Sequence, residues 1–333
     1  MYRQKSFLVL MLLVLFSIIL MGAENSDKVD KIYQQIRNSE LNYGYEESIL
    51  KFENEGKTIV CTLSIPKTKE KCPVVVLMPG FTGPRDEEYI PGTDERVFQR
   101  SARILAGHGF ATFRFDWRGY GDSDGEFAEA SFSSELSDTI AALNFIRKEL
   151  KNVVNVNSIG LIGFSQGGLI GTLAAEKDNR IDSLVLWSAP TNPAMNYSMI
   201  LTMDTISNGV KLNDGGILNS PIVLDGEVFC YLPLGKKFFT ELINTYPVSK
   251  IHKFKKPVMY ICGLKDAIVW PQPMMAEAYL QSHEGEHKLV KIDADHEFDY
   301  WDGPDAEKLT DAIYWSTSWL IVTLKHSNKL INP

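Results

Sequence analysis

Short apolar runs alternate with longer amphipathic segments through most of the chain. Nearly continuous apolar runs of this kind are typical of parallel strands buried on both faces. We expect six such strands, at residues 74–78, 111–115, 158–162, 183–187, 258–262 and 288–292. Apolar residues at helical spacing predict helices at residues 96–107, 132–150, 165–177 and 305–325, the second opening on Ser133-Ser134 as its N-cap. This alternation predicts an α/β fold, with a mostly parallel central sheet and helices on both faces.

Two segments depart from the alternation. Residues 48–52 and 58–63 flank Asn54-Glu55-Gly56, a pattern that predicts a β-hairpin with a glycine turn. Residues 189–256 separate two consecutive strands by far more than an ordinary connection, and they contain turn signals, a predicted hairpin around Asp225-Gly226 and a predicted helix near residues 235–244. We expect residues 24–188 and 257–333 to form the core and residues 189–256 to form a small inserted cap. A cap at one end of the sheet is a usual place for substrate selectivity.

The first residues have the pattern of a secretory signal peptide. Arg3 and Lys5 precede an apolar run from Phe7 to Met21, and small residues and a polar stretch follow it. The run is shorter than the roughly 20 residues that span a bilayer comfortably. We therefore predict a cleaved signal over residues 1–23, with an uncleaved N-terminal anchor as the alternative. Either would place the protein outside the cytoplasm, as a secreted, periplasmic or cell-envelope protein.

Composition and charge narrow the classes of partner. The chain is 44% hydrophobic and 23% charged, which is ordinary for a globular protein, and its net charge is −8. Loss of residues 1–23 would remove only two basic residues and no acidic one, and so make the balance more acidic. An acidic surface argues against nucleic acid and anionic lipid as partners. We expect no membrane partner beyond a possible N-terminal anchor, and the oligomeric state is left open.

The four cysteines do not indicate a metal site. None forms a CxxC motif or a cluster with histidines, so a zinc site is not expected. Cys61 and Cys262 lie in apolar strand runs, which favours small buried hydrophobic residues. A disulfide between Cys61 and Cys72 is the alternative in an exported protein.

The strongest local signal is Gly163-Phe164-Ser165-Gln166-Gly167, which directly follows a predicted strand and opens a predicted helix. This is the G-x-S-x-G nucleophile elbow in the context that it requires. The turn is so tight that side chains two residues before and after the serine would collide. We therefore expect Ser165 to be a nucleophile exposed at the edge of the sheet.

A serine hydroxyl needs a base to take its proton, and a carboxylate to orient that base. His296 alone among the histidines directly follows the final predicted strand. The others are expected in turns, linkers, solvated loops and the tail: His108, His252, His283, His287 and His326. Asp266 follows the penultimate strand and is the predicted carboxylate. Asp293 and Asp295 are too close to His296 in sequence to face its ring nitrogen easily, and we expect them to be surface charges.

The tetrahedral intermediate of acyl transfer also needs hydrogen-bond donors for its oxyanion. One predicted donor is the backbone N–H of Gln166. The other is the backbone N–H of Phe81 in the loop Pro79-Gly80-Phe81-Thr82-Gly83, which follows the first parallel strand. Each such donor is typically worth about 3 kcal/mol of barrier.

From about residue 45 to residue 325 the sequence resembles the α/β-hydrolase superfamily, within it the branch of bacterial cinnamoyl/feruloyl esterases and serine-aminopeptidase-like hydrolases. The segments that carry the resemblance are residues 80–83, 115–125, 163–168, 263–269 and 295–298. The chain order Ser165, Asp266, His296 is the order of that fold. Members of the branch usually have a histidine where this chain has Pro79, which puts the support of the oxyanion loop in doubt. Asp116 and Arg118 are expected to form a structural pair.

The resemblance implies an α/β-hydrolase fold and hydrolysis of a small-molecule carboxylic ester through an acyl-enzyme, with no metal or organic cofactor. The alternatives are a serine peptidase of aminopeptidase type, a lipase or thioesterase, and a non-catalytic binding protein. A peptidase would need an acid to grip the substrate amine, and the cap offers Asp204, Asp214, Asp225 and Glu227. Five aromatic residues are expected to fill the cap core rather than line a pocket: Phe229, Tyr231, Phe238, Phe239 and Trp270.

Overall fold

The computed structural model describes residues 25–38, 44–68, 70–224 and 226–325, so the predicted signal segment lies outside the described residues. Within them, an eight-stranded sheet has the order β1-β2-β4-β3-β5-β6-β9-β10. The strands are β1 (Tyr45–Asn54), β2 (Lys57–Pro66), β3 (Pro73–Met78), β4 (Ala111–Phe115), β5 (Asn155–Phe164), β6 (Ile181–Trp187), β9 (Val258–Gly263) and β10 (His287–Ile292). β2 pairs antiparallel with β1 and β4, and the remaining pairs are parallel.

The parallel strands are buried on both faces, as their sequences predict. Successive residues of β3 show this directly: Val74 and Val76 belong to the hydrophobic core on one side of the sheet, and Val75 and Leu77 to the core on the other. This is the period of two expected of a strand between two helical layers. The predicted hairpin is β1–β2, and Glu55 and Gly56 form its turn, both with positive φ.

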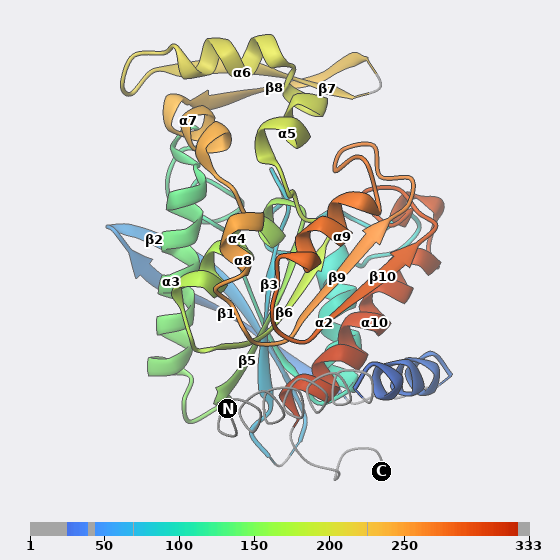
Figure 1. Ribbon diagram of the computed structural model, residues 1–333. Coiled ribbons are helices and arrows are strands. Elements are labelled where there is room, and N and C mark those ends of the chain that lie inside the picture. The colour runs from blue at the N-terminus through green and yellow to red at the C-terminus, as the bar shows by residue number, and fades with distance from the viewer. Residues whose placement is uncertain (1–24, 39–43, 69, 225, 326–333) are drawn as a thin grey trace, which may run out of the picture.

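Helices cover both faces of the sheet (Figure 1). They are α2 (Val97–Gly107), α3 (Phe132–Glu149), α4 (Gln166–Lys177), α5 (Pro193–Leu201), α6 (Met203–Val210), α7 (Lys236–Asn244), α8 (Val248–Ile251), α9 (Met274–Gln281) and α10 (Glu307–Leu324), with the short 3₁₀ helices η1 (Phe127–Glu129) and η2 (Tyr300–Asp302). α2 and α10 contribute to one core, and α3, α4 and α9 to the other. The α/β architecture is therefore the predicted one.

A helix at residues 25–37 packs beside α10. The Tyr33 ring stacks on Trp315 with centroids 3.9 Å apart, and the Tyr33 hydroxyl donates to Asp311 at 2.9 Å. Among the described residues, no helix is both long enough and apolar enough to cross a bilayer.

The segment predicted as a cap forms α5, α6, the two-stranded sheet of β7 (Ile217–Leu224) and β8 (Glu227–Gly235), α7 and α8. In Figure 1 most of it stands above the end of the sheet where β6 leads into α5. An aromatic cluster joins it to the core: Phe238 of α7 lies 5.5 Å from Phe81 and 5.7 Å from Phe132 between ring centroids. Phe238 and Phe239 are buried, so these two aromatic residues fill the cap core as expected.

Several local expectations were wrong. Ser131, and not Ser133-Ser134, is the N-cap of α3, and its hydroxyl accepts from the backbone N–H of Ser134. His283 is buried instead of solvated, and burial lowers its pKa to about 4. The favoured expectation for the cysteines is confirmed: Cys61 and Cys262 are free and buried, and the alternative disulfide between Cys61 and Cys72 does not form.

The prediction that Asp116 and Arg118 pair with each other is also wrong. Asp116 is bonded to the guanidinium of Arg85 instead. Arg118 forms an ion pair with Asp138 at 2.7 Å, and a second with Glu55 at 2.8 Å. Each group meets an opposite charge from another part of the chain because the loop after β4 directs the two side chains apart.

Candidate active site

Ser165 occupies a sharp turn between β5 and α4. Its φ of 49° and ψ of −117° are strained for a residue other than glycine. The glycines around it are required for the steric reason inferred from the sequence. A Cβ on Gly163 would collide with the backbone of Gly167, and a Cβ on Gly167 would collide with the backbone of Met78.

The structure brings the three predicted side chains together. His296 Nε2 lies 3.0 Å from Ser165 Oγ, and His296 Nδ1 lies 2.8 Å from Asp266 Oδ2. All three residues are buried, so Ser165 is not exposed as the sequence predicted. With Nδ1–H donating to Asp266, Nε2 is the free acceptor for the serine proton, which is the tautomer that general-base chemistry requires.

Asp266 is held by its own loop. Its Oδ1 accepts from the backbone N–H groups of Ile268 and Val269, each at 2.8 Å. Burial alone would raise the pKa of Asp266, but His296 and these two N–H groups together hold the pKa below its ordinary value. The carboxylate is therefore ionised at neutral pH and fixed in direction.

His296 lies in a compact turn after β10. Burial opposes its protonation, but Asp266, followed by Glu297 and Asp295, raises its pKa above the ordinary value of 6.5. Asp295 is not the surface charge expected, because its Oδ1 accepts from the backbone N–H groups of Glu297 and Asp299 at 2.8 and 2.9 Å. Asp293 is exposed and forms an ion pair with Lys265 at 3.1 Å, as expected of a surface charge.

Gln166, one of the two predicted oxyanion donors, is anchored by its side chain. Its Nε2 donates to both oxygens of Glu135, at 2.7 and 2.8 Å, and its Oε1 accepts from the hydroxyl of Tyr197. All three residues are buried. Tyr197 belongs to α5, so this network ties the cap to the residue that follows the predicted nucleophile.

The other predicted donor, Phe81, lies in the loop of residues 79–83, which we call the oxyanion loop. The N–H of Gly83 donates to the carbonyl of Gly80 at 3.2 Å, and Thr82 has a φ of 72°. The N–H of Gly80 donates to the carboxyl group of Glu87, a buried residue further along the same connection. That the backbone N–H groups of Phe81 and Gln166 receive an oxyanion stays a prediction.

Ser165 and His296 line a cavity of about 340 Å³ between the core and the cap, which we call the central cavity. The cap contributes only uncharged, mostly apolar residues: Ile200, Ile222, Leu224, Phe229, Cys230 and Leu232. Phe229 was expected in the cap core, so this expectation was wrong. Tyr231 and Trp270 are exposed and are not among the lining residues, so the expectation that they fill the cap core was also wrong.

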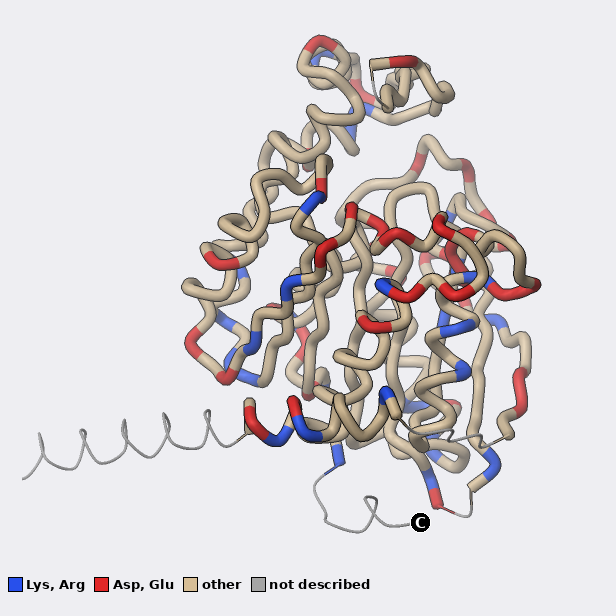
Figure 2. Tube along the Cα trace, turned by 90° about the vertical axis from the view of Figure 1, so that its right-hand side faces the viewer, with Lys and Arg blue, Asp and Glu red and all other residues tan. Residues whose placement is uncertain are grey.

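Acidic side chains line the core side of the central cavity. Among the described residues that line it, Glu87, Glu88 and Glu297 carry carboxyl groups and none is a lysine or arginine. Figure 2 shows that Asp and Glu gather on the loops at the cap end of the core. The cavity is therefore a poor environment for an anionic ligand.

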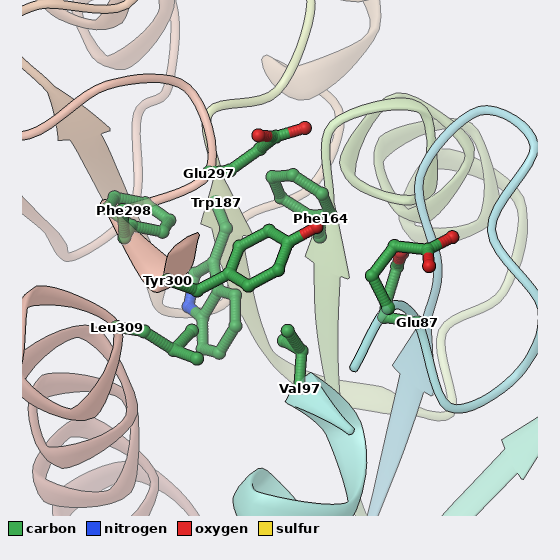
Figure 3. A pocket seen from close by; sticks show the side chains of 9 residues that line it. Glu87, Val97, Phe164, Trp187, Glu297, Phe298, Tyr300 and Leu309 are labelled. Atoms are coloured by element: carbon green, nitrogen blue, oxygen red, sulfur yellow. The ribbon is translucent and has the colours of Figure 1, made fainter. Parts of the chain in front are cut away.

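A second, much smaller cavity of about 30 Å³ adjoins the first. Figure 3 shows the Tyr300 ring pointing toward Phe164, with Glu87 on the opposite wall. Glu87, Glu135 and Tyr197 are the residues near the site that the sequence did not identify.

Comparisons with known proteins agree with this architecture. Residues 73–219 match the family described as the alpha/beta hydrolase fold. An uncharacterized 31.7 kDa protein of the traX–finO intergenic region of Escherichia coli is 32% identical over 127 residues, which is 38% of this chain and 41% of that protein. The quorum-quenching protein AidA of Acinetobacter baumannii is 24% identical, and the match covers 78% of this chain and 90% of AidA.

Among solved structures, Est1E of Butyrivibrio proteoclasticus with bound ferulic acid superposes with a TM-score of 0.59 and 25% identity, covering 80% of this chain and 96% of Est1E. The esterase domain of a Rhodothermus marinus protein superposes with a TM-score of 0.59 and 19% identity, covering 82% of this chain and 98% of that domain. The sheet order, the strained serine between β5 and α4 and these likenesses agree: the chain has the α/β-hydrolase fold, and its structural neighbours include bacterial esterases.

Proposed function

We propose that this protein is a serine esterase that cleaves a carboxylic ester through an acyl-enzyme. The observation that carries the proposal is the continuous chain of hydrogen bonds from Asp266 through His296 to Ser165 at the central cavity. A buried base that is oriented by a carboxylate and bonded to the serine hydroxyl is the arrangement of an activated nucleophile.

In the proposed reaction, Ser165 Oγ attacks the ester carbonyl while His296 Nε2 accepts its proton. The backbone N–H groups of Phe81 and Gln166 would stabilise the resulting oxyanion. His296 then gives the proton to the departing alcohol, and the acyl group stays on Ser165. Water repeats the sequence with His296 as its base, which frees the acid and restores the serine.

The proposed substrate is an uncharged ester with an apolar acyl group, of the cinnamoyl or feruloyl type in the first instance. The apolar cap lining and the acidic core side of the central cavity favour an uncharged group. The likeness to Est1E, whose structure holds ferulic acid, supports an aromatic acyl group. AidA is named a quorum-quenching protein, which adds bacterial quorum signals to the compounds to be tested.

An aminopeptidase needs an acid that grips the substrate amine. Of the cap acids considered for this role, Asp204, Asp214 and Glu227 are not among the residues that line the central cavity, and Asp225 lies outside the described residues. The acids that do line it, Glu87, Glu88 and Glu297, belong to core loops. Aminoacyl anilides therefore stay in the test as the competing substrate class, together with long-chain esters for the lipase or thioesterase alternative.

The test combines active-site labelling with a substrate panel. A fluorophosphonate probe should label the wild-type protein and the Ser133→Ala control, whose serine is exposed on α3, but not Ser165→Ala. The panel contains methyl ferulate, short and long nitrophenyl esters, aminoacyl anilides and bacterial quorum signals. Turnover of esters that disappears in Ser165→Ala supports the proposal. Labelling or turnover that survives this substitution, or cleavage of the anilides alone, refutes it.

Export of the protein is a separate proposal that rests on the sequence of residues 1–23. Fractionation of cells that express the full chain with a C-terminal tag tests it. The expected result is tagged protein outside the cytoplasm and shorter than the full chain by the predicted signal. Protein confined to the cytoplasm at full length would contradict the export.

A further inference from the structure

The oxyanion loop has no obvious support in its own sequence. Pro79 has neither a backbone N–H nor a polar side chain, and Gly80 and Gly83 carry no side chains at all. Glycines give a loop conformational freedom that must be restricted before its N–H groups can stabilise a transition state. Some other part of the chain must therefore hold this loop in place.

The carboxyl group of Glu87 lies against the inner side of the loop. Its Oε1 accepts from the N–H of Gly80. Its Oε2 lies only 2.6 Å from the position that a Cβ on Gly83 would take, so a side chain there would displace it. The carboxyl group thus contacts both ends of the turn that contains Phe81, and Gly83 leaves room for it.

Glu87 is itself fixed by the surrounding structure. It adopts a φ of 62°, which is strained for a glutamate and persists only where other contacts enforce it. Arg96 Nη1 donates to the Glu87 carbonyl at 2.6 Å, and the N–H of Glu87 donates to the Pro84 carbonyl at 2.9 Å. The side chain is 5% exposed. Burying a carboxyl group costs free energy, so the surrounding contacts must compensate for the burial of Glu87.

Burial raises the pKa of Glu87 to about 8, against the opposing effect of its bond to Gly80. Glu88 and Glu297 raise this pKa further, and His296 lowers it. Near pH 7 most Glu87 side chains are therefore neutral. A neutral acid can accept from Gly80 without placing a full negative charge beside a developing oxyanion.

We propose that Glu87 is a positioning residue, whose carboxyl group holds residues 80–83 in the conformation that directs the Phe81 N–H at the oxyanion. The inference rests on the proposed esterase function. Glu87 acts through the loop and makes no bond to the reacting atoms.

The first test compares Glu87→Ala with Glu87→Gln. Glutamine keeps an oxygen that accepts from Gly80, so its kcat should stay within a few fold of the wild-type value. Alanine removes the acceptor, and its kcat should fall tenfold or more, toward the roughly 100- to 1000-fold that loss of one oxyanion donor costs. KM should change little, because the apolar cap lining is untouched. Glu95→Gln is the matched control, since Glu95 lies on the same connection but bonds to Arg100 and Arg103.

The second test keeps Glu87 but displaces its carboxyl group from the loop. Gly83→Ala places a Cβ where the carboxyl group now lies, and it should lower kcat in the wild-type background. In the Glu87→Ala background the same substitution should have little further effect, because the two changes remove the same contact. This variant decides the question if Glu87→Ala does not fold.

The outcomes separate the two proposals. If the wild-type protein is labelled at Ser165 and hydrolyses esters while folded Glu87→Ala or Gly83→Ala retains the wild-type kcat, the role of Glu87 is refuted and the esterase function stands. Equal losses in Glu87→Ala and Glu87→Gln would also refute it, since the acceptor would then be irrelevant. If the wild-type protein neither reacts with the probe nor hydrolyses any ester, the proposed function fails, and this inference with it.

Discussion

Replacing Asp266 by asparagine should disable the proposed reaction while leaving the fold intact. Asparagine has the same shape, and its oxygen can still accept from the N–H groups of Ile268 and Val269, which now donate to Asp266 Oδ1 at 2.8 Å. The amide NH₂ group then faces His296 Nδ1, where Asp266 Oδ2 now lies at 2.8 Å. That nitrogen must become an acceptor, so the ring proton moves to Nε2, which can no longer take the proton of Ser165.

The expected loss follows from this change of tautomer. In serine proteases with the same three side-chain types, the equivalent substitution lowers kcat about 10⁴-fold, or about 5 kcal/mol of barrier. Because Asp266 and His296 are both buried here, little water can substitute for the missing carboxylate. We expect a loss of the same order.

The assay is kcat on a short nitrophenyl ester across pH, with the rate of fluorophosphonate labelling as a second readout. Asp266, followed by Glu297 and Asp295, raises the pKa of His296, so the wild-type rate should rise with pH through an inflection above pH 6.5. In Asp266→Asn this inflection should move to lower pH. Asp293→Asn, on the exposed side of the same region, should behave as wild type. A folded Asp266→Asn variant with more than a tenth of the wild-type kcat would refute the assigned role.

Three further predictions follow from the surroundings of the site. Burial raises the pKa of Glu135 from 4.5 to about 8, so the folded state binds this proton more tightly than the unfolded state. The resulting stabilisation is present below pH 4.5 and is lost as pH rises toward 8, by at most about 1.4 kcal/mol per pH unit. Glu135→Gln should therefore flatten the fall in Tm between pH 5 and 8, and an unchanged slope would contradict this. Tyr197→Phe removes one buried hydrogen bond to Gln166 and should cost about 1–3 kcal/mol in urea unfolding, whereas a cost near zero would mean that the bond contributes nothing. Glu297→Gln removes one negative charge from the central cavity and should raise kcat/KM for a succinate monoester several-fold relative to kcat/KM for the uncharged butyrate ester; equal effects on both esters would exclude charge selection.

The sequence predicted the strands and the position of the three central side chains for a common physical reason. Strands buried on both faces need continuous apolar residues, and residues directly after parallel strands meet at one edge of the sheet. Ser165, Asp266 and His296 each follow such a strand, so their meeting could be inferred from order alone.

What could not be inferred depends on contacts between distant segments. Glu87 lies in the run Arg85-Asp86-Glu87-Glu88, which looks like a solvated loop, and its burial becomes visible only when the loop folds back on Gly80. Arg118 has Asp116 two residues away but bonds to Asp138 on α3. In both cases the partner is set by tertiary structure, and the local sequence carries no pattern that reveals it.

The hydrogen bond between Tyr197 and Gln166 joins the cap over the central cavity to the residue that directly follows Ser165. Under the proposed function, substrate choice and turnover therefore share a physical connection. A graft that exchanges α5 for the corresponding helix of an esterase would alter both properties at once, unless the donor helix also supplies a phenol at that place. If the proposed function holds, efforts to change substrate choice should begin at the β7–β8 hairpin, which lines the pocket but does not carry Tyr197.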